Sequence, residues 1–206
     1  MLGAILTFLS GIAASFLAWF LVSVLVKPKL QIDDKLYKFK SIDYKGSFVY
    51  KVKVTNLSTF FAAYDVVLAA RVYIYGLVSS DPTMYRTYVI SPGAKNIPYI
   101  TKAGGKSDQF SGNERFFILK PPYFDRKDKG KLRKLYNENH ETEPLDVIMT
   151  LEDVFNIIDE QKDKTTIEFM ITATSTFSAS RTYTTKCFRL TDIETVDEFD
   201  GESLME

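Results

Sequence analysis

The chain has 206 residues, of which 46% are hydrophobic and 14% aromatic, and it contains one cysteine. This apolar content excludes an intrinsically disordered chain, and the single cysteine excludes a small scaffold held together by disulfides. The formal net charge is zero, but residues 27–140 carry 21 basic and 10 acidic side chains (+11), whereas residues 141–206 carry 5 and 16 (−11).

The first 26 residues predict a transmembrane helix. Residues 2–26 hold no charged side chain, and 14 of these 25 residues are Leu, Ile, Val or Phe. As a helix they would extend about 37 Å, enough to cross the hydrocarbon core of a bilayer, which is about 30 Å thick. Their apolar side chains would contribute about −6 kcal/mol to insertion. Trp19 lies toward the charged end, where interfacial aromatic residues are common.

A cleaved signal peptide and a buried helix of a soluble protein are the alternatives for this segment. No basic residue precedes the apolar run, which is longer than the roughly 7–15 residues of a signal-peptide core. Val24-Leu25-Val26 stand where small residues would precede a cleavage site. A helix in a soluble core is seldom apolar on every side. We therefore expect a signal anchor that stays in the membrane.

Lysines follow the apolar segment closely and none precedes it. The five are Lys27, Lys29, Lys35, Lys38 and Lys40. Basic residues stay on the cytoplasmic side, so this bias predicts an outer N-terminus, a cytoplasmic C-terminal domain and lysines that face lipid headgroups. Asn56-Leu57-Ser58 is a glycosylation sequon and argues for the opposite orientation, although Asn at a strand end is also a common turn residue. The free Cys187 agrees with a reducing compartment.

One face of the apolar segment carries a small side chain at every fourth residue. This stripe consists of Gly3, Thr7, Gly11 and Ser15. Small residues let two membrane helices approach closely, but they are also common in membrane helices generally. A lone anchor and a self-associating anchor both remain open from the sequence.

The rest of the chain predicts an all-β fold, an immunoglobulin-like antiparallel β-sandwich over residues 27–191, followed by an acidic tail over residues 192–206. Alternating apolar side chains predict strands at 47–56 and 63–75, which we expect to form a hairpin. In the second strand Tyr64 is expected on the apolar face. Further strands are expected at 29–33, 84–90, 97–101, 115–119, 167–173 and 181–190.

One or two short helices are also predicted. Thr150-Leu151-Glu152-Asp153 resembles a capping box that would open a helix over 151–158, and residues 127–137 form a second candidate. This candidate lies in an insertion, within residues 121–144, whose basic side chains are Arg126, Lys127, Lys129, Lys131, Arg133 and Lys134. Such an insertion would contact lipid headgroups or an acidic partner, or be a solvated loop. Nucleic acid is the least favoured partner, because the charges of the domain otherwise balance.

No catalytic, metal or cofactor site is predicted. His140 is the only histidine and lies in a polar stretch, and Cys187 has no histidine near it in sequence. No phosphate-binding glycine loop is present. We therefore expect a non-enzymatic protein with no cofactor, no metal and no small-molecule substrate. An enzyme whose site is assembled from dispersed residues is the alternative.

Two stretches carry a resemblance to known β-sandwich proteins. One helix, a lysine-rich neck and a β domain resemble membrane-anchored immunoglobulin-like proteins. Tyr50-Lys51-Val52-Lys53-Val54-Thr55-Asn56-Leu57-Ser58, and residues 167–188 with the run Ser180-Arg181-Thr182-Tyr183, are similar to the cytoplasmic sandwich of inward-rectifier potassium channels. The resemblance implies the fold class alone, because this chain has one membrane helix and neither a pore helix nor a glycine-rich selectivity filter.

These observations predict a single-pass membrane protein whose β domain binds or scaffolds a protein partner, as an accessory subunit of a membrane-associated complex. The expected contacts are membrane lipid and one or more proteins. The alternative is a homo-oligomeric membrane effector with a cytoplasmic sensing domain, assembled through the small-residue stripe.

Overall fold

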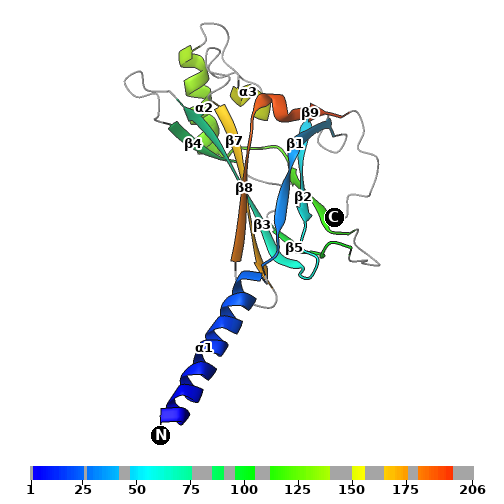
Figure 1. Cartoon of the computed structure of the whole chain (residues 1–206). Coiled ribbons are helices and arrows are strands. Elements are labelled where there is room, and N and C mark those ends of the chain that lie inside the picture. The colour runs from blue at the N-terminus through cyan, green and yellow to red at the C-terminus, as the bar shows by residue number, and fades with distance from the viewer. Residues whose placement is uncertain are drawn as a thin grey trace.

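Figure 1 shows the computed structural model of the chain, in which an N-terminal helix projects from a β-rich body. The structure describes residues 2–25, 27–41, 47–75, 85–90, 96–104, 112–139, 150–155, 165–175 and 181–196. Strands in two sheets make up most of it, and antiparallel pairs predominate. The expectation of a mostly β chain behind one apolar helix is therefore confirmed.

The N-terminal helix α1 (Leu2–Leu25) has 24 residues and extends about 36 Å. Between Ile5 and Val22 none of its residues is buried. Large side chains are exposed along it, with Phe8 at 70% and Trp19 at 66%. The helix is thus long and apolar enough to span a membrane, and no described part of the chain covers its sides.

The first sheet has the strand order β6-β2-β1-β9. Its strands are β1 (Leu30–Lys40), β2 (Phe48–Asn56), β6 (Glu114–Leu119) and β9 (Ile193–Thr195). β1 continues beyond the predicted segment 29–33. The prediction ended too early because a bulge between Ile32 and Leu36 interrupts the alternation of apolar side chains, which resumes at the buried Leu36. β9 pairs in parallel with β1 and lies after residue 191, the predicted end of the domain. Residues 197–206 of the predicted tail lie outside the described residues.

The second sheet has the order β4-β3-β7-β8, and β5 also pairs with β3. Its strands are β3 (Ala63–Tyr75), β4 (Tyr85–Ile90), β5 (Asn96–Ile100), β7 (Thr165–Ser175) and β8 (Arg181–Phe188). The predicted hairpin of β2 and β3 is wrong, because the two strands belong to different sheets. Their connection instead carries the chain from one sheet to the other.

A bulge near the start of β3 also corrects one predicted face. The register with β7 shifts between Tyr64 and Val67, and Asp65 has a positive φ of 48°. The extra residue of a bulge reverses the side-chain alternation. Tyr64 is therefore 38% exposed rather than in the core, while Ala63 and Val66 are buried.

Buried side chains from both sheets form one hydrophobic cluster, and two α-helices that lie between β6 and β7 in the chain also contribute to it. α2 (Arg126–Asn139) and the short α3 (Leu151–Phe155) cover the end of the body opposite to α1 (Figure 1). We call the end that joins α1 the proximal end and the end with α2 and α3 the distal end. β1 runs from the proximal to the distal end (Figure 1).

Candidate functional site

The small-residue stripe of α1 has its hydroxyl groups bonded within the helix. Thr7 Oγ1 donates to the Gly3 carbonyl at 3.0 Å, and Ser15 Oγ donates to the Gly11 carbonyl at 2.9 Å. These bonds lower the cost of placing hydroxyls in hydrocarbon, because no donor is left without a partner. The stripe lines a shallow groove between Phe8, Ile12 and Phe16. A second helix would therefore bind here by close packing rather than by hydrogen bonds.

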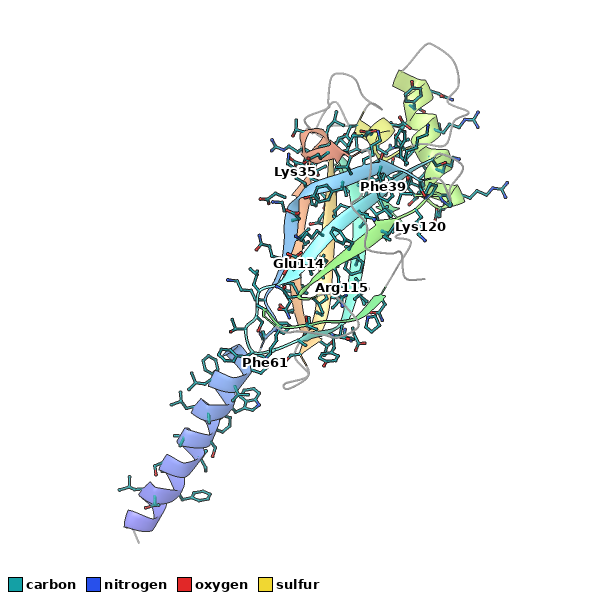
Figure 2. The ribbon with its side chains drawn as sticks, turned by 90° about the vertical axis from the view of Figure 1, so that its right-hand side faces the viewer. Lys35, Phe39, Phe61, Glu114, Arg115 and Lys120 are labelled. Atoms are coloured by element: carbon teal, nitrogen blue, oxygen red, sulfur yellow. The ribbon has the colours of Figure 1, made fainter. Side chains whose placement is uncertain are left out.

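The five lysines that were expected to face the membrane lie in two different parts of the body. Lys27 and Lys29 are exposed at the proximal end. β1 carries Lys35, Lys38 and Lys40 away from Leu30, toward the distal end. Figure 2 shows Lys35 on this distant part of the body. Nearness in sequence was a poor guide to position, because an extended strand moves away from the helix faster than any other backbone.

Lys38 is also not available for lipid, because it lies inside the fold. It is 9% exposed, pairs with the Glu152 carboxylate of α3 and lies 3.9 Å from the ring centroid of Phe48. The helix that supplies Glu152 begins at the predicted capping box, in which the Asp153 amide donates to Thr150 Oγ1 at 3.2 Å. Sequence reasoning missed this ion pair, because its partners lie 114 residues apart.

Two buried tyrosines lie beside this ion pair. The rings of Tyr50 and Tyr123 meet edge to face at 5.5 Å, and the Tyr123 hydroxyl donates to the Phe48 carbonyl. Burial raises the pKa of both phenols well above their usual range, and the Glu152 charge adds to this for Tyr50. Phenols held in the neutral form do not serve as bases, and the contacts of this cluster connect β1, β2 and α3.

The basic insertion forms the amphipathic helix α2 and not a solvated loop. Asp125 caps its start by accepting the Asp128 amide at 2.6 Å. Leu132 and Leu135 are buried in the core, at 0% and 6% exposed. The basic side chains point outward and are exposed: Arg126, Lys127, Lys129, Lys131, Arg133 and Lys134. Because α2 lies at the distal end (Figure 1), this basic surface faces away from the point where α1 joins the body.

Asn56, the sequon residue, is a buried structural residue. It is 0% exposed, and its Nδ2 donates to the carbonyls of Phe61 at 2.9 Å and Thr101 at 3.1 Å. Its Oδ1 accepts the Ser58 amide at 3.0 Å. A glycan on Nδ2 would replace one of its two N–H donors and would not fit in the buried site. The turn interpretation of Asn56 is therefore the one that the folded chain supports.

Residues 57–61, which we call the proximal loop, carry an exposed apolar surface that the sequence interpretation passed over. Phe60 is 78% exposed and Leu57 is 40% exposed. The Leu57 amide donates to the Lys29 carbonyl at 2.8 Å, which ties the loop to the segment that follows α1. Figure 2 shows Phe61 next to the end of α1. The pair Phe60-Phe61 directly after the polar residues Ser58-Thr59 was the signal in the sequence.

Two polar contacts of β1 set the ionisation of surface groups. A hydrogen bond from Lys186 of β8 lowers the pKa of Asp34, and the Lys186 charge lowers it further. Tyr37 is half-buried and donates to Asp33 at 3.0 Å. Burial raises the pKa of Tyr37 to about 12, and the bond to Asp33 adds to the shift.

Within the described residues, no group of three or more His, Cys, Asp or Glu side chains is placed to hold a metal ion. Cys187 is exposed on β8, and partial burial together with the neighbouring Glu168 raises its thiol pKa. A raised pKa keeps the thiol protonated and poorly nucleophilic. His140 lies outside the described residues.

No protein-family model matches the chain, and no curated protein matches it.

Proposed function

We propose that this protein is a single-pass membrane protein whose immunoglobulin-like β-sandwich binds or scaffolds a protein partner, as an accessory subunit of a membrane-associated complex. The observation that carries the proposal is the exposed apolar side of α1, of which no residue between Ile5 and Val22 is buried. In water such a surface would drive aggregation, whereas in a bilayer the acyl chains cover it. The shared core of the two sheets supports a sandwich.

The proposed orientation places the N-terminus outside and the β domain in the cytoplasm. Topology is decided during insertion, before β1 has formed, so all five lysines after α1 count toward the positive-inside bias although they later separate. The burial of Asn56 removes the one sequence feature that argued for an outer domain.

Protease protection in sealed vesicles tests this orientation. Lys38 is left unchanged because it pairs with Glu152 in the core. The test variant replaces Lys27, Lys29, Lys35 and Lys40 with Glu. A matched control makes the same change of charge on α2, at Lys127, Lys129, Lys131 and Lys134. The β domain should become protected on the opposite side in the first variant only, and an unchanged protection pattern would contradict the lysine argument.

Self-association through α1 is the second candidate, and the groove along the small-residue stripe favours it. Nothing lies within 4 Å of a Cβ added at Gly11, so Gly11→Leu fills the groove without disturbing the helix itself. Crosslinked dimers in the membrane should disappear with Gly11→Leu if helices pack there. Co-purification in mild detergent with mass spectrometry then separates a heterologous partner from additional copies of this chain.

A further inference from the structure

We propose that the proximal loop is a second membrane contact, in which Phe60 inserts into the interface of an anionic phospholipid leaflet beside the point where α1 emerges. The inference rests on the proposed membrane anchoring by α1. It adds a function for the β domain, since a domain held at two points has a fixed orientation on the membrane.

The loop lies close to the membrane because a short segment and a backbone hydrogen bond connect it to the end of α1. Lys29 follows Leu25 by four residues, which reach at most about 14 Å when fully extended. The Leu57 amide is hydrogen-bonded to the Lys29 carbonyl at 2.8 Å. With Leu25 at the edge of the hydrocarbon, the loop backbone lies in or next to the headgroup layer, and the Phe60 side chain extends from it.

The loop is also held by several hydrogen bonds, which lower the conformational entropy that it would lose on inserting into a membrane. Asn56 holds it from inside through the Phe61 carbonyl. The Phe61 amide donates to Ser58 Oγ at 3.2 Å, and the Ala103 amide donates to the Ser58 carbonyl at 2.7 Å. Phe60 is therefore presented at 78% exposure by a loop bonded on three sides, to the α1 linker, to Asn56 and to the segment after β5.

The charges around the loop match an anionic surface. Among the described residues, exposed basic side chains at the proximal end include Lys27, Lys29, Lys102 and Arg181. Lys102 lies between two residues that bond to the loop region, and Arg181 begins β8 opposite Thr174. Exposed acidic side chains near the loop are Asp65 and Glu114, and Glu114 lies opposite Thr55 and pairs with Lys53. Basic side chains beside exposed aromatic rings are typical of protein surfaces that bind the headgroup region.

The occupant of this surface is lipid rather than a second copy, because α1 brings every copy of the loop to a leaflet whether or not copies associate. A protein that covered Phe60 would instead need a complementary apolar surface at the same depth. These two occupants give different results with quenchers that are confined to the lipid or to water.

Fluorescence quenching of the full chain in nanodiscs of phosphatidylcholine and phosphatidylglycerol tests the proposal. In a Cys187→Ser background, single cysteines at Phe60→Cys, Val89→Cys and Leu17→Cys are labelled with the environment-sensitive dye NBD. Val89 is 56% exposed and pairs with Arg71, which lies about 24 Å from Ala63 at the proximal end, so it is the matched site in water. Leu17 reports on α1 itself.

At position 60 we expect at least fivefold less quenching by aqueous iodide than at position 89, and strong quenching by a lipid with a shallow nitroxide. Equal iodide quenching at positions 60 and 89 would overturn the proposal. Protection from iodide without quenching by the lipid nitroxide would also overturn it, since a protein would then cover Phe60. A deep nitroxide that fails to quench position 17 would instead refute the anchoring by α1, which keeps the two failures distinct.

Discussion

Replacing Asn56 tests whether the junction between the two sheets depends on one buried amide. Asn56→Ala removes donors to the carbonyls of Phe61 and Thr101 and an acceptor for the Ser58 amide, at distances of 2.9, 3.1 and 3.0 Å. Each hydrogen bond of this kind contributes about 1 kcal/mol, so we expect the free energy of unfolding to fall by about 3 kcal/mol. For a chain of this size that lowers Tm by about 6–12 °C.

Thermal unfolding of the full chain in detergent, followed by near-ultraviolet circular dichroism, measures this effect. Asn96→Ala is the matched control, because Asn96 is exposed at the start of β5 and its loss should cost less than about 0.5 kcal/mol. Asn56→Asp keeps the acceptor but loses the donor, so it should destabilise at least as much as Asn56→Ala. The reasoning is refuted if Asn56→Ala lowers Tm no more than Asn96→Ala.

Three further outcomes concern the core and the pH dependence. Lys38→Met leaves the Glu152 carboxylate without its partner and should lower the free energy of unfolding in urea by about 2 kcal/mol. The double variant with Glu152→Gln should lower it by less than the sum of the two single variants. Leu132→Ala should cost about 3 kcal/mol, whereas Lys134→Ala, at a side chain 80% exposed, should change stability by less than about 0.5 kcal/mol. The Tyr37 phenol has a higher pKa in the folded chain than in the unfolded chain, so it contributes stability below pH 10 and this contribution is lost as the pH rises toward 12. Tyr37→Phe should therefore make Tm fall less steeply between pH 10 and 12. Equal slopes for the two proteins would contradict the role of the Tyr37 phenol.

The sequence predicted strands well and their partners poorly. The alternation in β3 gave its bounds, because apolar side chains at every second position have only one simple interpretation. That pattern is the same whether a strand joins its neighbour in a hairpin or crosses to another sheet. The crossing after β2 begins at Asn56, whose hydrogen bond to the Thr101 carbonyl links segments 45 residues apart.

Bulges account for two further errors in the strands. In β1, residues 33–35 interrupt the alternation before the core position of Leu36, so the local pattern ended too early. In β3, the left-handed backbone of Asp65 turned Tyr64 outward. Neither change has a signal in hydrophobic periodicity, which assumes a regular strand.

The candidate site was predictable where it depends on composition and unpredictable where it depends on packing. The apolar length of α1 and the outward basic face of α2 follow from local sequence. The distal position of Lys35 and Lys40, and the burial of Lys38, depend on the direction of β1 relative to α1. The position of the proximal loop next to α1 depends on its backbone hydrogen bond to Lys29, which the sequence does not predict.

Flotation of the full-length protein with membranes after an alkaline carbonate wash tests the central claim, that α1 remains in the lipid. Peripheral proteins are released by this wash, whereas a helix that spans the bilayer is retained. We expect the intact chain to float with the lipid, with a mass that includes residues 1–26. Recovery in the aqueous fraction of a chain that begins near Lys27 would contradict the account.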